Sequence, residues 1–157
     1  MHVRQLGPDE VETLRTIRLE ALRSDPDAFG STLERELGRT DDDWRAWLGR
    51  GATFVAEDST GPAGLVAVVH HEELAAVGVY AMFVSDRARG QGVGRALVEA
   101  GIAWAASSTA DRLVLLVIEG NGPATTLYES CGFTRTGRSE VRERDGVTEV
   151  EMARRTR

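Results

Sequence analysis

The residues best placed to do chemistry in this chain form a glycine-rich stretch flanked by two arginines. Gly90, Gly92 and Gly94 carry no side chains, so successive backbone N–H groups can point at the oxygens of a polyanion. Arg89 and Arg95 add positive charge at either end. The stretch follows an apolar segment and opens an amphipathic one, where a helix N-terminus would favour negative charge. This pattern predicts a pyrophosphate site formed by Arg89, Gly90, Gln91, Gly92, Val93, Gly94 and Arg95.

Other interpretations of the glycine triplet require a different spacing or no ligand. A dinucleotide fingerprint needs a further glycine where Arg95 or Leu97 stands, which makes a hydride-transferring dinucleotide enzyme a distant alternative. A Walker loop needs a glycine-lysine pair, which this chain lacks. A tight strand-to-helix turn would explain the glycines by their positive φ alone. The two arginines and a second motif favour the phosphate site over such a turn.

The second motif lies at residues 121–133. Pro123 is suited to the first position of a helix, and Gly132 fits the left-handed residue that closes one. Tyr128 lies on the face of this helix that carries its other apolar residues. Asn121 stands just before the helix and just beyond an apolar run, so it is expected at the carboxyl end of a central strand.

Together the two motifs resemble the GNAT superfamily of acyl-CoA-dependent N-acyltransferases. The resemblance covers residues from about 77 to 133 by specific spacing, and the flanks only by the order of their elements. It rests on an Arg-x-x-Gly-x-Gly motif with a valine five residues before it, and on the second motif: Val84, Arg89, Gly92, Gly94, Asn121, Ala124, Leu127, Tyr128, Gly132 and Phe133. It implies a single-domain α/β fold over residues 1–157, with one GNAT-like mixed central sheet flanked by helices.

The hydrophobic pattern predicts the elements of such a sheet. Strands are expected at 3–6, 53–57, 63–70, 77–84, 113–118, 134–142 and 147–153. Two helices are expected before the second strand, separated by a polar loop that includes residues 29–36, and Thr40 with Asp43 resembles a capping box. The strand at 77–84 reads as buried on both faces and parallel to the strand at 113–118. One further helix is expected after each of these two strands.

The resemblance also implies how acetyl-CoA would be held and used. The backbone of Met82, Phe83 and Val84 would pair with the pantetheine arm and polarise the thioester carbonyl. Asn121 would hydrogen-bond the pantetheine amides, unless it only caps its helix. Tyr128 would protonate the departing thiolate, unless its hydroxyl is tied to the sheet. Transfer from a tyrosine of pKa ~10 to a thiolate of pKa ~8.5 is uphill by about 2 kcal/mol.

The base for the acceptor amine is harder to place. Many members of the family carry a glutamate on the strand before the phosphate loop, whereas residues 77–84 contain no acid and no histidine. Deprotonating a lysine-like amine at pH 7 costs about 4.6 kcal/mol and an α-amine only about 1.4, so weakly basic acceptors do not require a base. Glu34 and Glu36, in the loop expected to border the acceptor cleft, are the substrate-binding candidates; a solvated surface run is the alternative.

Composition excludes several other classes of protein. The net charge is −6 and no basic stripe is present, which argues against nucleic acid as a partner. No charged-then-apolar leader and no apolar run near the ~20 residues of a membrane span are found, so a cytoplasmic protein is expected. Cys131 is interpreted as a small buried residue. His70 and His71 would point to opposite faces of a strand, so no metal site is expected.

These observations favour an enzyme that transfers acetyl directly from acetyl-CoA, as co-substrate, to a primary amine in a ternary complex. The acidic residues between 25 and 43 favour a small cationic or neutral acceptor. A protein amine acetyltransferase and a non-catalytic acyl-CoA-binding regulatory domain remain open. Homodimers are common in the family, which leaves a homodimer open as well.

Overall fold

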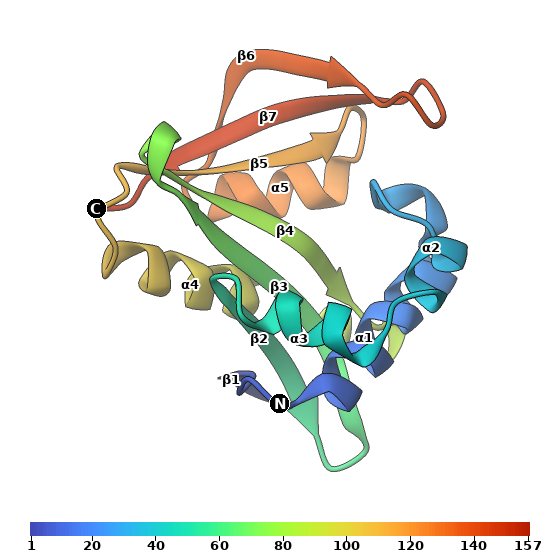
Figure 1. The fold of residues 1–157 in the computed structure, drawn as a ribbon. Helices are drawn as coiled ribbons and strands as arrows, with labels where there is room; N and C mark the ends of the chain where they lie inside the picture. Colours follow the sequence, from blue (N-terminus) through green and yellow to red (C-terminus); the bar gives the residue numbers. More distant parts are fainter.

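The computed structural model describes all 157 residues, and one seven-stranded sheet organises them (Figure 1). The strands are β1 (His2–Gln5), β2 (Ala52–Asp58), β3 (Gly61–His71), β4 (Ala76–Val84), β5 (Arg112–Ile118), β6 (Thr134–Val141) and β7 (Thr148–Arg155). The helices are α1 (Val11–Ser24), α2 (Leu33–Leu37), α3 (Asp41–Leu48), α4 (Val93–Ala106) and α5 (Gly122–Ser130), with 3₁₀ turns η1 (Pro26–Ala28), η2 (Glu72–Leu74) and η3 (Asp86–Ala88).

The sheet has the order β1-β2-β3-β4-β5-β7-β6 and is antiparallel except between β4 and β5. Helices α1 to α3 cover one face and α4 and α5 the other, so two apolar layers form (Figure 1). Leu14, Ile17 and Trp44 anchor the first layer, and Leu97 and Phe133 the second. The predicted fold class, a mixed α/β sheet flanked by helices, is confirmed.

Strands β4 and β5 run side by side only at their beginnings. Their parallel pairing covers three pairs, from Ala76 with Arg112 to Gly78 with Val114. A bulge in β4 explains the divergence, because two residues of β4 lie opposite one of β3 and Ala81 adopts a φ of +58°. The strand is therefore not buried on both faces along its length as predicted, and Tyr80 is 48% exposed. The edge of β4 that faces β5 is unpaired beyond Gly78.

The N-terminal half departs from prediction at the expected polar loop. Residues Leu33–Leu37 form α2, so three helices rather than two precede β2. Thr32 caps this helix by accepting a hydrogen bond from the Arg35 amide, and a threonine at this position is the sequence signal for the start of the helix. The capping box of Thr40 and Asp43 is present as predicted. Pro123 is the second residue of α5 rather than the first, because that helix begins at Gly122.

Candidate active site

The glycine-rich stretch forms an exposed helix N-terminus. Gly90 and Gly92 have φ values of +75° and +77°, and Gly92 is the N-cap of α4. No side chain caps this helix and its first turn holds no acid, whereas α2, α3 and α5 are each capped by a side chain of their own. A Cβ on either glycine would meet no atom within 4 Å, so the space in front of the loop is open. The first N–H groups of α4 are thus free to bind an anion.

The two arginines of this loop differ in what they contact. The Arg89 side chain donates from Nε to the carbonyl oxygen of Val84 at 2.9 Å and forms ion pairs with Asp25 and Asp86, at 2.9 and 2.8 Å. Arg89 therefore braces the loop against the ends of β4 and α1. Arg95 is exposed and pairs only with Glu99, one turn along α4. Of the two, Arg95 is the more readily released to a phosphate.

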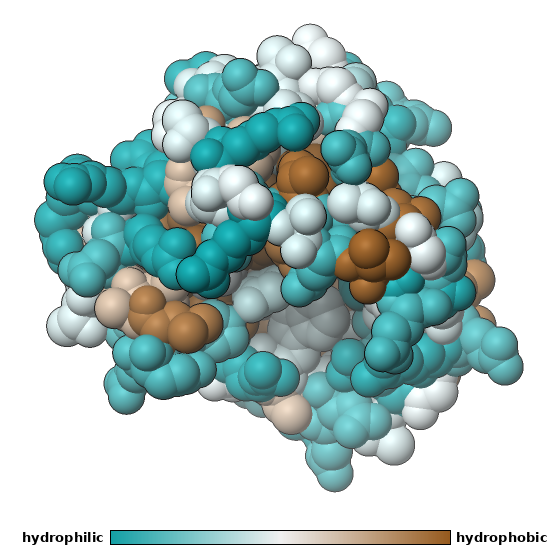
Figure 2. All heavy atoms as spheres, turned by 90° about the horizontal axis from the view of Figure 1, so that it is seen from above, coloured by the Kyte–Doolittle hydropathy of each residue, from teal (hydrophilic) through white to brown (hydrophobic).

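A cavity of about 410 Å³ opens where β4 and β5 diverge. It is lined by residues of η1 and its following loop, of β4 and β5, and of α5 and the C-terminal hairpin: Ala28, Phe29, Gly30, Val79, Tyr80, Ala81, Met82, Val114, Leu115, Leu116, Tyr128, Glu140, Glu149 and Glu151. Seen from the β6–β7 side, apolar residues lie near the middle of this face with hydrophilic residues around them (Figure 2).

Tyr128 reaches this cavity from α5. Its ring is 7% exposed and packs edge-on against Phe133, with 6.0 Å between ring centroids. Burial, and to a lesser degree Cys131, raises the pKa of Tyr128 to about 12. The hydroxyl makes no hydrogen bond within the protein and is not sealed from solvent. A tyrosine tied to the sheet by its hydroxyl, the structural alternative, is therefore not what the fold contains.

A third glycine lies where the phosphate loop, the β4 edge and α5 meet. A Cβ on Gly94 would lie 3.2 Å from Leu127 Cδ2 and 3.4 Å from Met82 Cε, so a larger residue would require these side chains to shift by a few tenths of an ångström. Phe83 points the other way, into the layer under α1, and is 3% exposed. Met82 and Val84 pack against the layer under α4 and α5. This arrangement leads from the open helix N-terminus along a free strand edge to Tyr128.

Asn121 lies at the start of α5, beyond the end of β5. Its Oδ1 accepts a hydrogen bond from the Ala124 amide at 3.2 Å, so the side chain caps the helix. The structural alternative is thus present, and it uses the oxygen of the side chain. The amide NH₂ group has no partner in the protein. A contact between that group and a pantetheine carbonyl stays a prediction.

Of the two glutamates proposed for acceptor binding, Glu36 is wrongly placed for that role. It is 1% exposed, and its carboxylate pairs with Arg18 at 3.1 Å and with Arg39. Arg18 is itself buried and lies over the rings of Phe29 and Trp47. Glu36 therefore holds α2 against α1 instead of facing an acceptor. Glu34, on the same helix, is exposed. It does not line the cavity and forms no ion pair.

Loss of the Glu36 charge is expected to destabilise the protein strongly. Glu36→Gln leaves the Arg18 guanidinium buried without its counter-charge, and burial already lowers the pKa of Arg18. Urea unfolding should show a loss of about 3 kcal/mol or more. Glu34→Gln, on the exposed side of the same helix, is the matched control and should stay within about 0.5 kcal/mol. Equal stability of both variants would contradict a structural role for Glu36.

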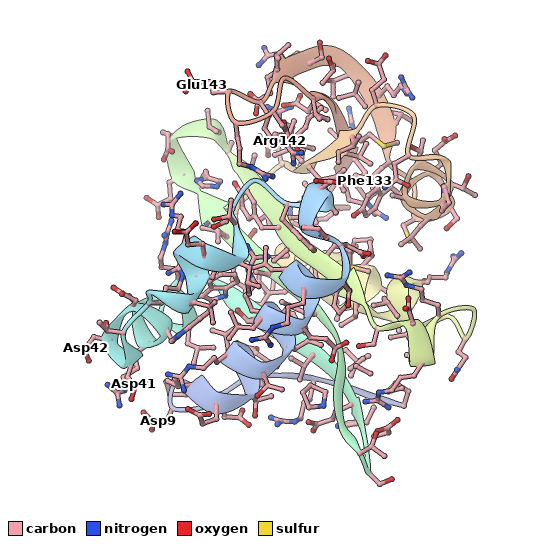
Figure 3. The ribbon with its side chains drawn as sticks, turned by 90° about the vertical axis from the view of Figure 1, so that its right-hand side faces the viewer. Asp9, Asp41, Asp42, Phe133, Arg142 and Glu143 are labelled. Carbon is pink, nitrogen blue, oxygen red and sulfur yellow. The ribbon has the colours of Figure 1, made fainter.

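The other acids that were expected to steer the acceptor are mostly engaged or remote. Asp25 pairs with Arg89, Asp41 with Arg15 and Asp42 with Arg45. Figure 3 places Asp41 and Asp42 at the opposite end of the molecule from Arg142 and the C-terminal hairpin. A field set by these residues is therefore not centred on the cavity.

Three glutamates that sequence reasoning missed do line the cavity. Glu149 and Glu151 alternate along β7 with Val150 and Met152, whose side chains enter the core, and Glu140 pairs with Glu149 across the β6–β7 hairpin. The alternation in residues 148–152 was a usable signal for the exposed face of β7. Only the topology, which inserts β7 beside β5, brings that face to the cavity.

The β6–β7 loop is tied to the segment that follows α1. Arg142, 8% exposed, donates to the carbonyl oxygens of Phe29 and Asp27 at 3.0 and 2.8 Å, and pairs with Asp145 (Figure 3). Because Phe29 lines the cavity, these bonds hold one wall of it against the hairpin.

Two further expectations concern Cys131 and membrane spans. Cys131 is buried and unpaired, as predicted. No helix has the length and apolar character required to cross a membrane.

The diverging β4–β5 pair with an uncapped helix N-terminus beside it agrees with the class of protein that the comparisons with known proteins show, the acetyltransferases. The acetyltransferase (GNAT) family model matches residues 15–133, and the chain belongs to this family. The mycothiol acetyltransferase of Thermobispora bispora is 36% identical over 134 residues, which are 82% of this chain and 44% of that protein. The chain spans less than half the length of this and of several other curated relatives it matches.

Solved structures agree on the fold. An acetyltransferase of the GNAT family from Streptococcus pneumoniae superimposes with a TM-score of 0.82 at 20% identity and covers 98% of both chains. An acetyltransferase from Salmonella typhimurium, determined with its cofactor acetyl-CoA, superimposes with a TM-score of 0.79 at 19% identity. The match covers 100% of this chain and 94% of that chain. These two structures show the fold, and the family model over residues 15–133 confirms the family that the two sequence motifs indicated.

Proposed function

We propose that this protein transfers the acetyl group of acetyl-CoA directly to the primary amine of a small, cationic acceptor. The observation that carries the proposal is one continuous path. It starts at the uncapped N-terminus of α4, follows the free edge of β4 and ends in a cavity that holds both Tyr128 and three glutamates. A donor and an acceptor can therefore meet in that cavity from opposite sides.

The cofactor would lie along this path by backbone contacts. Its pyrophosphate would accept hydrogen bonds from the N–H groups at Gly92, Val93 and Gly94, with Arg95 as the mobile charge. The pantetheine arm would add to the unpaired edge of β4 as an extra strand at Met82 to Val84. Ala81, at the bulge, lines the cavity, and backbone groups of β4 there would polarise the thioester carbonyl.

Tyr128 would protonate the departing thiolate of CoA. With its pKa at about 12, the transfer to a thiol of ordinary pKa ~8.5 is uphill by about 5 kcal/mol, more than for a free tyrosine. The same burial disfavours the thiolate charge, which raises the thiol pKa and narrows this gap when CoA is in place. The high pKa also keeps the hydroxyl protonated throughout the neutral range.

The acceptor side of the cavity favours positive charge. Glu140, Glu149 and Glu151 bring three carboxylates there from β6 and β7, and no arginine lines this cavity. The curated relatives named mycothiol acetyltransferase agree with a small molecule as acceptor. An amine panel with acetyl-CoA, read out as free thiol, tests the function. Binding of acetyl-CoA without thiol release from any amine would favour the non-catalytic alternative.

Charge selection at the acceptor side gives a further prediction. The double variant Glu149→Gln and Glu151→Gln should raise the KM for a dicationic amine by about tenfold and leave the KM of a neutral amine unchanged. Added salt should shrink the difference, because screening acts over about 10 Å at 0.1 M. Glu143→Gln, in the exposed loop between β6 and β7, is the matched control. Steady-state kinetics with both amines across a range of ionic strength test this prediction. Equal KM values in all variants would contradict charge selection by Glu149 and Glu151.

A further inference from the structure

Tyr80 occupies the space that a side chain at Gly78 would fill. The Tyr80 ring folds back along β4, and a Cβ on Gly78 would lie only 2.4 Å from the Tyr80 hydroxyl oxygen. The same hydroxyl lies 2.8 Å from Nε2 of His71, on the neighbouring strand β3. The two rings meet edge to face, with 6.1 Å between their centroids. The missing side chain of Gly78 is thus what allows a tyrosine–histidine pair to form over β4.

Tyr80, one member of this pair, lines two cavities. Tyr80 directly precedes the bulge at Ala81 and lines the cavity that contains Tyr128. It also lines a second cavity of about 420 Å³ between α3 and β3, which contains His71. A proton taken up at Tyr80 from the first cavity can therefore reach His71 in the second cavity, and the second cavity is open to solvent.

Charged groups surround the pair on all sides. On the side of the second cavity these are Arg39, Asp43 and Arg50, and Arg39 is already paired with Glu36. Behind the imidazole, His71 Nδ1 lies 4.0 Å from a carboxylate oxygen of Glu73. On the other side are the cavity glutamates Glu140, Glu149 and Glu151. Burial raises the pKa of Tyr80, and the charge of Arg50 opposes this shift.

We propose that Tyr80 and His71 form the proton relay that deprotonates the acceptor ammonium, an inference that rests on the acetyl transfer proposed above. The ammonium gives a proton to the Tyr80 oxygen, while the Tyr80 hydroxyl proton passes to the unprotonated Nε2 of His71. The free amine then forms the C–N bond, the C–S bond breaks, and the thiolate takes a proton from Tyr128. The nitrogen loses its second proton as the amide forms, and this proton restores the Tyr128 hydroxyl. His71 returns the first proton to solvent, so one proton is released for each acetyl group transferred.

The cavity glutamates are poorly suited to this step although they are near. Carboxylates stabilise the ammonium form of a bound amine and so raise its pKa, which favours binding but opposes deprotonation. A base near the operating pH transfers protons more efficiently, and imidazole is the side chain with an ordinary pKa near ~6.5. The relay thus separates recognition of the cation from removal of its proton. Tyr80 is the residue that touches the acceptor, and His71 acts through it.

The kinetic test uses two acceptors that differ in amine pKa. For a strongly basic amine, Tyr80→Phe and His71→Gln should each lower kcat/KM by about tenfold to a hundredfold, with less than about threefold change for a weakly basic amine. The KM for acetyl-CoA and the unfolding midpoint should stay unchanged. His70→Gln, on the opposite face of β3, is the control and should behave as the wild type.

A readout independent of turnover is the tautomer of His71, observed by ¹⁵N NMR of the imidazole. The relay requires Nδ1 to carry the proton and Nε2 to be an acceptor, and Tyr80→Phe should shift the Nε2 resonance. The opposite tautomer overturns the relay. So does equal loss of kcat/KM for both amines, or no loss, in an active enzyme. Absence of thiol release by the wild type with every amine would overturn the proposed function itself.

Discussion

Gly92→Glu is expected to abolish CoA binding while the protein stays folded. Gly92 is the N-cap of α4 and has a φ of +77°, so most other residues, glutamate included, cost about 1–2 kcal/mol of backbone strain there. The glutamate would also place a negative charge where the pyrophosphate should lie. Hydrogen bonds to a charged group contribute about 1.5–3 kcal/mol each, so losing two should weaken binding at least a hundredfold. Isothermal calorimetry with CoA measures this loss.

Two controls separate the charge from the strain. Gly146→Glu, in the β6–β7 loop, introduces the same residue at a similar φ of +71° with open space around it, and it should bind CoA normally. Gly92→Asn keeps a residue that tolerates the left-handed region and adds no charge, so its loss of affinity should be much smaller. Undiminished CoA binding by Gly92→Glu would contradict a phosphate site at this helix. Parallel thermal unfolding shows whether the fold persists.

Tyr128→Phe is expected to lower kcat by about tenfold to a thousandfold and to leave the KM for acetyl-CoA nearly unchanged. The reason is that the hydroxyl acts only when the thiolate leaves, so its loss removes an interaction made in the transition state. The ring, which packs against Phe133, is retained in the variant. Single-turnover release of thiol from acetyl-CoA measures the chemical step directly, without a contribution from product release.

The structural role of Tyr128 can be tested in the same variant. Since the hydroxyl has no hydrogen-bond partner in the protein, its removal should change the free energy of unfolding by less than about 1 kcal/mol. A large loss of stability with an unchanged single-turnover rate would show that Tyr128 is a buried aromatic residue with a packing role only. The high pKa predicts one more property: the rate should show no decline from ionisation of Tyr128 below about pH 10.

Local features of the site were predictable because each depends on neighbours in the chain. Glycines at 90 and 92, a helix that begins at Val93, and the left-handed Gly132 at the end of α5 follow from residue type and spacing alone. The spacing of both motifs also indicated the family and the mixed sheet. Where the local signal was weak, as for the short helix α2, the prediction was wrong because its cap was not recognised.

What only the tertiary structure decided concerns residues far apart in the sequence. The bulge at Ala81 separates β4 from β5, and the insertion of β7 beside β5 then brings Glu149 and Glu151 to the opening. Glu36 was expected at the acceptor side and is instead buried against Arg18, since the packing of α2 on α1 sets its burial. Strand pairing and helix packing depend on contacts between distant segments, and one sequence reports such contacts only through a weak alternation of polar and apolar residues.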